Sequence, residues 1–372
     1  MSTSARTYSQ TYPQSDAILR LLPLDDLRPH VVNLTRGEFS TDGIMQTSQD
    51  DVDAIFDEHL PAFLARAKTT VPLVIWAHGG IVSERAGLAI AGLQIPWWRD
   101  NGAYPLHFVW ETGFVETLRQ LLGWRSDRDR LDDSPPEVDA ALSTNVRQGR
   151  FGSQLWTAVK RSAALASGPD GGAHYVGARL ARFCAENPGR VTVHAAGHSA
   201  GAIFQSHFIP AARSQGAPRF DSLQLLAPAL RVDGFRSQLL PLVGSDIDKM
   251  TLYTMNMKAE EDDNCLQVYR RSLLYLVSRV FEPEHEAPIL GLEQSIRDDG
   301  ELVAAFGLQP GVQGRAEVVW SPTPADAPLD SRSSAISHGG FDNDPDTMNS
   351  VARRILGRPD ILEFPIGRGV GR

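Results

Sequence analysis

Cysteine is scarce in this chain, and basic residues do not outnumber acidic ones. Cys184 and Cys265 are the only cysteines among 372 residues, too few and too isolated for a disulfide framework or a zinc-binding spacing. Such usage is typical of a reducing compartment. Lys and Arg number 36 against 45 Asp and Glu, which gives a formal net charge of −9. Because binding to a phosphate backbone requires clustered positive charge, we expect no nucleic-acid partner.

Long apolar runs and metal-binding motifs are also missing. No stretch approaches the ~18 apolar residues that a membrane-spanning helix needs. The N-terminal residues lack the basic head and apolar run of a secretory signal. The sequence has no H-E-x-x-H motif and no tight cluster of His and Asp residues. We therefore expect a cytoplasmic protein with no membrane span, no bound metal and no cofactor.

What the chain does contain is an alternation of short apolar runs with amphipathic segments. Its 42% of hydrophobic and 22% of charged residues are ordinary for a globular protein. The alternation predicts an α/β fold, in which a mostly parallel sheet carries helices on both faces. The spacing predicts strands at 30–36, 43–46, 71–77, 104–110, 191–195, 220–226, 250–257 and 317–320, and helices at 50–68, 84–99, 175–187, 264–281 and 345–356.

The domain boundaries follow from composition. Residues 1–27 are polar and irregular, and we interpret them as an N-terminal arm. Residues 28–372 then form one domain. Within it, residues 114–168 are rich in charged residues, Gly, Ser and Pro, which predicts an insertion over the sheet. This insertion is either a cap that shapes a binding pocket or a solvated excursion without a functional role.

The segment VTVHAAGHSAG, residues 191–201, carries the main functional prediction. A short apolar strand runs into Gly-His-Ser-Ala-Gly and then into a helical segment. This order of strand, G-x-S-x-G turn and helix is typical of a nucleophile elbow, which holds a serine hydroxyl clear of the sheet. The flanking Gly197 and Gly201 allow strand and helix to approach closely. Ser199 is therefore the candidate nucleophile, and the Ala200 amide at the helix start is a candidate oxyanion donor.

A second glycine-bearing turn follows the apolar run 71–77. The sequence there is His78-Gly79-Gly80. Glycines directly after a buried strand let backbone N–H groups face a cavity, as an oxyanion loop requires. Gly80 or Ile81 would then supply the second amide donor, and His78 would support the loop without transferring protons. The alternative is a tight turn that serves only packing.

Acyl transfer by a serine also needs a base and a carboxylate that orients the base. His338 is the candidate base, since it lies in the loop after the last predicted strand and two glycines follow it. The candidate acids crowd the turn after the strand at 250–257. We favour Asp263, and then Asp262 and Glu260, with Asp233 after the preceding strand as an outside alternative. The alternative role for Asp263 is to cap the helix predicted at 264.

With these motifs, the chain resembles the α/β-hydrolase superfamily, specifically its esterase and lipase-like serine hydrolases. The resemblance spans about residues 30–357 and rests on AHGG, GHSAG, the acidic loop and SHGGF. It implies an eight-stranded, mostly parallel sheet and hydrolysis through an acyl-enzyme. By position, the family's nucleophile, base, acid and oxyanion donors fall on Ser199, His338, Asp263, Gly80 and Ala200. The residues expected to surround the bound substrate are His78, Gly79, Ile81 and His198.

The chain departs from one subgroup of this superfamily. The hormone-sensitive-lipase type has three glycines after the loop histidine and GDSAG at the elbow, whereas this chain has two glycines and GHSAG. The acidic loop also lacks the Gly or Asp-x-x-Val pattern of the family, so the identity of the acid stays open.

The function predicted from the sequence is cofactor-free hydrolysis of carboxylic esters on small-molecule substrates. The alternatives are a peptidase, amidase or thioesterase on the same fold, or a catalytically silent interaction module. With a histidine as the base, activity would rise with pH around a midpoint of roughly 6 to 7. The acyl group, the leaving group and the oligomeric state stay open.

Overall fold

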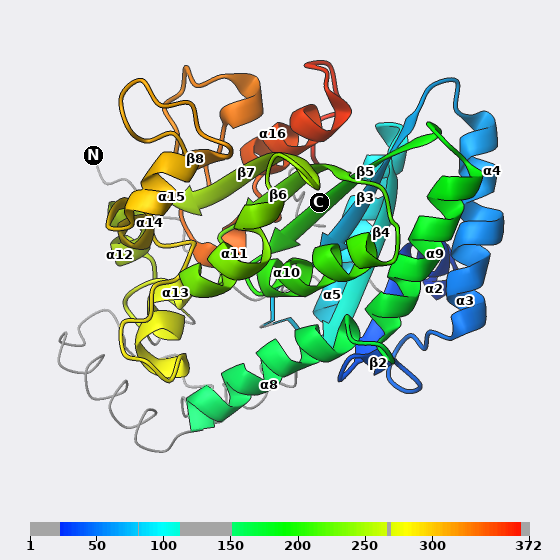
Figure 1. Cartoon of the computed structure of the whole chain (residues 1–372), viewed down its shortest axis with the longest axis horizontal. Coiled ribbons are helices and arrows are strands. Elements are labelled where there is room, and N and C mark those ends of the chain that lie inside the picture. Colours follow the sequence, from blue (N-terminus) through cyan, green and yellow to red (C-terminus); the bar gives the residue numbers. More distant parts are fainter. Residues whose placement is uncertain (1–22, 81, 112–150, 266–268, 366–372) are drawn as a thin grey trace, which may run out of the picture.

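The computed structural model describes residues 23–80, 82–111, 151–265 and 269–365 and has an α/β architecture (Figure 1). The eight strands lie in the order β2-β1-β4-β3-β5-β6-β7-β8, and every neighbouring pair is parallel except β1 and β2. The predicted mostly parallel sheet is confirmed. The strands are β1 (Val31–Thr35), β2 (Glu38–Phe39), β3 (Val71–Ala77), β4 (Tyr104–Glu111), β5 (Val191–His198), β6 (Phe220–Leu226), β7 (Ile247–Met255) and β8 (Glu317–Ser321).

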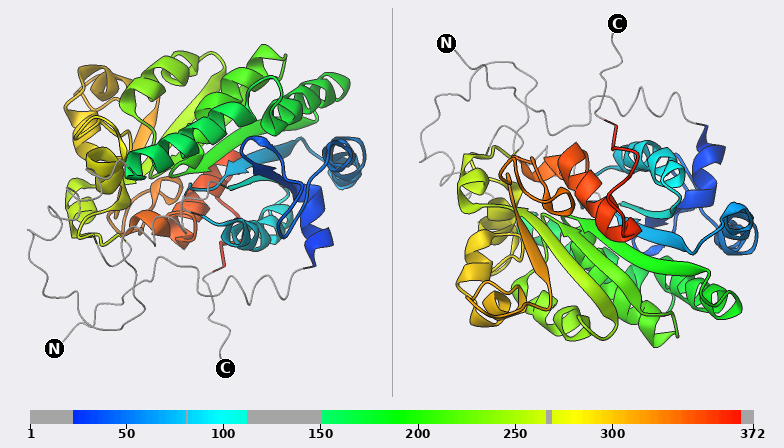
Figure 2. Two further views of the ribbon diagram at one scale, coloured as in Figure 1. Left: turned by 90° about the horizontal axis from the view of Figure 1, so that it is seen from below. Right: turned by 90° about the horizontal axis from the view of Figure 1, so that it is seen from above.

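Helices cover both faces of the sheet, as Figure 2 shows. One face carries α5 and α16, over an apolar core that includes Trp76 and Trp98. The other face carries α8, α9 and α10, over a larger core that includes Phe108 and Phe204. The bounds of these helices are Glu84–Asp100 for α5, Phe151–Ala166 for α8, Gly172–Glu186 for α9, Gly201–Ser214 for α10 and Pro345–Leu356 for α16.

Shorter helical segments fill the connections. The α-helical ones are α2 (Leu24–Leu27), α3 (Gln49–Ala54), α4 (Leu60–Arg66), α11 (Val232–Gln238), α12 (Met257–Asp262), α13 (Leu273–Leu276), α14 (Glu293–Arg297) and α15 (Gly300–Ala305). The others are the 3-10 segments η1 (Arg28–His30), η3 (Leu240–Leu242), η5 (Leu329–Ser331) and η6 (His338–Gly340) and the π-helical η2 (Ile55–His59) and η4 (Val277–Phe281). Among the described residues, no helix has the length and apolar character needed to cross a membrane.

The central strands follow the predicted pattern, whereas the hairpin at the edge does not. β3 and β6 have the predicted bounds, because strands buried on both faces are continuous apolar runs. The second strand predicted at 43–46 is wrong. Arg36 and Gly37 have positive φ angles and make the turn, so β2 begins at Glu38. The amides of Ile44 and Met45 instead donate to the Glu84 carboxylate, which holds this segment outside the sheet.

Two predicted helices are divided in the structure. The helix predicted at 50–68 is a run of α3, the π-helical η2 and α4, and its N-cap is Ser48. The π-helical turn ends two residues before Pro61, whose missing N–H removes an α-helical hydrogen bond. The helix predicted at 264–281 begins only at α13, where the Ser272 hydroxyl accepts from the amide of Tyr275. Residues 266–268 lie outside the described residues.

The described part of the segment predicted as an insertion is α8. This helix contacts α10 and η4, so it packs along the side of the sheet that α10 covers (Figure 1). Residues 112–150, which make up most of the predicted insertion, lie outside the described residues, as do residues 1–22 of the predicted N-terminal arm.

Candidate active site

The segments that carry the candidate residues meet at one edge of the sheet. β3, β5, β7 and β8 are parallel, so the residues after them emerge at the same carboxyl edge. Open α/β sheets bind their ligands at this edge. The candidate residues there are His78 to Gly80 after β3, Ser199 after β5, Asp263 after β7 and α12, and His338 after β8.

Ser199 occupies a turn that only small neighbours permit. Its φ angle is 55°, which places a non-glycine residue in the left-handed region. An added Cβ at Gly201 would lie 2.1 Å from the carbonyl oxygen of Ala77, and one at Gly197 would lie 2.7 Å from Gly201. The Ser199 amide donates to the Leu226 carbonyl at 2.8 Å. Both flanking glycines are therefore required for the strand and the helix to meet at this serine.

The side chains of Ser199 and His338 are in hydrogen-bond contact. Ser199 Oγ lies 2.8 Å from His338 Nε2, although 139 residues separate them in the sequence. Both residues are 3% exposed. Burial, and then the charge of His198, lower the pKa of His338 well below its ordinary value. The imidazole is therefore neutral near pH 7, and the hydroxyl donates to its Nε2.

Asp263 contacts the main chain of His338. Its Oδ2 accepts from the His338 amide at 2.9 Å, and its Oδ1 accepts from the Asn264 amide at 2.7 Å. The Nδ1 atom of His338 is buried and has no hydrogen-bond partner among the described residues. Burial raises the pKa of Asp263, although the two amide bonds act in the opposite direction. The carboxylate of Asp263 thus lies beside His338 but accepts from its backbone and not from its ring.

The other acids considered from the sequence make different contacts. Glu260 is fully buried and accepts from the Ser272 hydroxyl, and burial raises its pKa well above the ordinary value. Asp262 is exposed and pairs with Lys258 one helical turn away. Asp233 is exposed and pairs with Arg231. Among these four acids, Asp263 alone has a described contact with His338.

The two glycines after β3 pack directly against the elbow. An added Cβ at Gly79 would lie 3.1 Å from the Cβ of Ser199, and one at Gly80 would lie 2.9 Å from the Cβ of Ala200. On its other side, Gly80 faces Val159 of α8, whose Cγ1 would be 3.1 Å from the same added atom. The loop therefore lies against Ser199 with its backbone, and its role as an oxyanion loop stays a prediction. Ile81 lies outside the described residues.

His78 ties this loop to the neighbouring strand. Its Nδ1 donates to the Gly79 carbonyl at 2.8 Å, and its Nε2 accepts from the Trp110 amide at 3.1 Å. The indole of Trp110 donates back to the His78 carbonyl at 3.0 Å. Burial lowers the pKa of His78 to about 4, so the ring is neutral at pH 7. These contacts agree with a supporting role, whereas contact with a substrate stays a prediction for His78, Gly79, Ile81 and His198.

His198 and Asp342 form a second buried pair beside the base. His198 Nε2 donates to the His338 carbonyl at 2.9 Å, and its Nδ1 lies 3.5 Å from Asp342 Oδ2. His198 is 5% exposed and Asp342 2%. Asp342 is not among the residues predicted from the sequence. Its only signal was its position four residues after His338 in the same loop.

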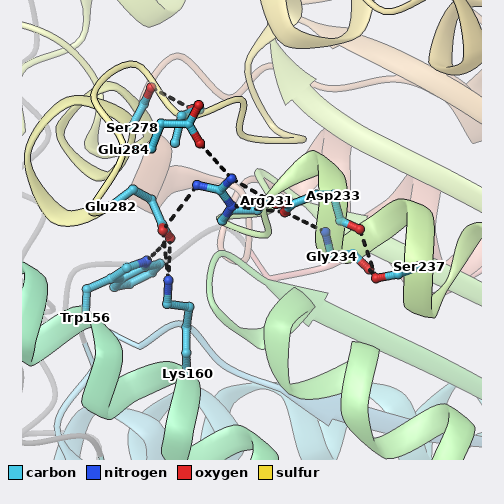
Figure 3. A network of polar contacts seen from close by, with 10 residues as sticks. Trp156, Lys160, Arg231, Asp233, Gly234, Ser237, Ser278, Glu282 and Glu284 are labelled. Atoms are coloured by element: carbon cyan, nitrogen blue, oxygen red, sulfur yellow. Dashed lines mark hydrogen bonds and ion pairs between the residues drawn. The ribbon is translucent and has the colours of Figure 1, made fainter.

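An ionic network around the buried Glu282 holds α8 beside the site (Figure 3). The Glu282 carboxylate, whose side chain is 1% exposed, accepts from the Trp156 indole at 2.6 Å and from Lys160 at 2.8 and 2.9 Å. Arg231 lies 3.6 Å from the same carboxylate and also pairs with Asp233. The sequence gives no signal for this network, because its members come from three distant segments.

Neither a search for metal-binding groups nor a comparison with known proteins assigns a function to this site. Within the described ranges, no group of three or more His, Cys, Asp and Glu side chains could hold a metal ion. Comparison with protein-family models, with curated proteins and with solved structures found no significant match.

Proposed function

We propose that this protein is a serine hydrolase that cleaves carboxylic esters through an acyl-enzyme on Ser199. The observation that carries the proposal is the 2.8 Å contact between Ser199 Oγ and His338 Nε2. In the ground state for general-base catalysis, the hydroxyl of the nucleophile donates a hydrogen bond to a neutral imidazole. The left-handed φ angle of Ser199 supports the same assignment, because strain of this kind is retained at functional sites.

The proposed reaction has two halves. His338 Nε2 takes the hydroxyl proton while Ser199 Oγ bonds to the acyl carbon, and the carbonyl oxygen becomes an oxyanion. His338 then gives this proton to the departing alkoxide, which leaves as the alcohol. In the second half, a water molecule attacks the acyl-enzyme and its proton passes to His338. The proton returns to Ser199 Oγ as the carboxylic acid departs.

The surrounding groups stabilise the charges that these steps create. The amides of Ala200 and Gly80 are the proposed donors to the oxyanion, and Ala200 is the N-cap of α10, where the helix dipole favours negative charge. The carboxylate of Asp263 is the proposed counter-charge to the His338 imidazolium, since it already accepts from the backbone of that residue. None of these groups requires a cofactor.

We further propose that the fold is of the α/β-hydrolase type and that α8 belongs to a cap-like insertion. The proximity of Val159 to Gly80 supports this assignment, because it brings the insertion to the oxyanion loop. We also propose a cytoplasmic location, on the ground that Cys184 and Cys265 are free thiols.

A fluorophosphonate probe tests the proposed nucleophile. The wild-type protein should be labelled at Ser199, and the Ser199→Ala variant should not be labelled. Ser206→Ala is a matched control, since Ser206 is equally buried and its hydroxyl donates to the Ile203 carbonyl within α10. Failure of the folded wild-type protein to react would favour the alternative of a silent interaction module.

The leaving group is tested with a panel of substrates of one acyl chain. We expect nitrophenyl esters to be cleaved with a higher kcat/KM than the matching thioesters and anilides. A preference for thioesters or anilides would move the assignment to a thioesterase, amidase or peptidase, because the three share the same catalytic residues.

A further inference from the structure

The elbow itself contains a histidine, His198, whose side chain contacts the loop after β8. It is the last residue of β5 and is 5% exposed. Its ring lies beside the ring of His338, with 5.3 Å between the centroids. Its two nitrogens approach the loop after β8 at two points, the His338 carbonyl and the Asp342 carboxylate. A residue within the G-x-S-x-G motif is thus joined to the loop that carries the proposed base.

The partners of His198 determine where its protons are. A carbonyl oxygen can only accept, so His198 Nε2 carries a hydrogen. Nδ1 faces a carboxylate oxygen at 3.5 Å, and two lone pairs at that distance would repel each other. A proton on Nδ1 removes this repulsion, and the raised pKa of His198 agrees with it. The pair is best described as an imidazolium beside a carboxylate.

This arrangement completes the fixation of the His338 backbone. The amide of His338 donates to Asp263 at 2.9 Å, and its carbonyl accepts from His198 at 2.9 Å. The backbone amide and the backbone carbonyl of His338 are thus each hydrogen-bonded to a buried side chain, and the two side chains come from different segments of the chain. Because the position of this backbone determines where the imidazole lies, the distance from His338 Nε2 to Ser199 Oγ depends on both contacts.

We propose that His198, held by Asp342, is a positioning residue that fixes the His338 backbone so that the imidazole of His338 reaches Ser199. The inference rests on the proposed function, since it assigns His198 a role in activating Ser199. His198 does not touch the reacting atoms and transfers no proton to substrate.

The same pair also sets the charge around the base. The groups that contact His338 are Asp263 after α12, His198 at the end of β5 and Ser199 at the elbow, and Asp342 in its own loop pairs with His198. Burial by itself would lower the pKa of His198, but the charge of Asp342 and the contact with the His338 carbonyl raise it overall. A cationic His198 in turn disfavours protonation of His338. Removing this charge should move the acid limb of the activity profile to higher pH.

Two substitutions at His198 separate the hydrogen bond from the charge. His198→Leu removes both, and we expect kcat to fall by about tenfold to a hundredfold with KM little changed, because the base is misplaced. His198→Gln places an amide donor near the position of Nε2, and kcat should recover to within a few fold of wild type. His194→Gln is a matched control on the same face of β5, since His194 is also buried and bonds only Ser222 and Thr192 among the contacts described.

Asp342→Asn tests the charge at the other end of the pair. The side chain keeps its volume, and a neutral His198 can still donate from Nε2. We expect kcat to be retained and the acid midpoint to move upward, as in His198→Gln. A folded His198→Leu variant with wild-type kcat would overturn the proposal, and so would pH profiles of His198→Gln and Asp342→Asn that coincide with that of the wild type.

A measurement without turnover distinguishes failure of this inference from failure of the proposed function. In the full chain with labelled histidines and Ser199→Ala, nuclear magnetic resonance should show His198 protonated on both nitrogens at pH 7, and His338 neutral. A neutral His198 would overturn the pair. A doubly protonated His198, together with a folded wild-type protein that does not react with fluorophosphonate, would sustain the pair and overturn the hydrolase assignment.

Discussion

At the scale of single residues, the backbone of Gly80 lies too close to the elbow for any side chain. A Cβ there would be 2.9 Å from the Cβ of Ala200 and 3.1 Å from Val159. We expect Gly80→Ala to displace the loop and lower kcat by about 10²-fold or more, the usual effect of losing one oxyanion donor. Gly300→Ala is the control, since a Cβ at Gly300 meets nothing within 4 Å. Steady-state kinetics of both variants measure the difference, and equal kcat values would remove Gly80 from the oxyanion site.

The identity of the acid can be decided by removing one charge at a time. Asp263→Asn should lower kcat by about 10²- to 10⁴-fold, because the His338 imidazolium loses its counter-charge. Asp262→Asn should leave kcat unchanged, since the exposed Asp262 pairs only with Lys258 among its described contacts. The ester assay that detects Ser199 activity measures both. If Asp263→Asn keeps full activity, the acid lies elsewhere.

The pH profile of activity follows from the burial of His338. An ordinary histidine predicts a midpoint of roughly 6 to 7. Burial and the charge of His198 lower the pKa of His338, so the imidazole stays unprotonated at lower pH than usual. We expect kcat/KM to reach half its maximum below pH 6.5 and to remain constant between pH 7 and 8. A midpoint above pH 7 would contradict this prediction.

Single positions differ in how much the sequence could predict about them. That Ser199, His338 and the glycines lie together could be predicted because each follows an apolar strand, and parallel strands bring their carboxyl ends together. The ranking of Asp263 above Asp262 was a choice among neighbours, which the structure separates by burial. The contact of His198 with the His338 loop could not be predicted, because it depends on which face of β5 the loop covers.

At the scale of elements, the network around Glu282 holds α8 in place. Glu282→Gln should lower the free energy of unfolding by about 1–3 kcal/mol, because Lys160 and Arg231 lose a buried partner. Chemical denaturation measures this loss. Compared with the wild type, the variant should show a larger increase in the rate of hydrogen exchange in α8 than in the sheet. Lys258→Met is the control, since its pair with Asp262 is exposed and should contribute nothing measurable. Unchanged exchange in α8 would contradict an anchoring role.

Elements buried on both faces were predictable, and those shaped by single contacts were not. β3 and β6 match their predicted bounds, because continuous apolar runs of strand length have few alternatives. β2 was misplaced, because the Glu84 carboxylate binds the amides at residues 44 and 45 from 40 positions away. The π-helical turns η2 and η4 leave no periodic signal that a helical spacing of 3.6 residues would detect.

At the scale of the whole molecule, several histidines are buried in the neutral form. Burial lowers the pKa of His30 and His78 to about 4, and the pKa of His107 and His194 to about 3. In the unfolded chain these groups titrate near 6.5. Between pH 6.5 and the lowered values, the unfolded chain therefore binds more protons than the folded protein. Their contribution to stability is complete above pH 6.5 and is lost as the pH falls.

The expected result is a steep loss of stability in mild acid. Each of these histidines costs up to about 1.4 kcal/mol per pH unit, and His338, whose pKa is also lowered, adds to the loss. Glu260, Asp263 and His198, whose pKa values are raised, act in the opposite direction. Urea denaturation at pH 7 and pH 5 should show a free energy of unfolding several kcal/mol lower at pH 5. His107→Asn should reduce the difference in free energy of unfolding between pH 7 and pH 5 by the contribution of one histidine. His285→Asn, at an exposed position, should leave this difference unchanged. Equal stability at the two pH values would mean that the buried imidazoles gain protons without unfolding, which requires water or counter-charges that reach them in the folded protein.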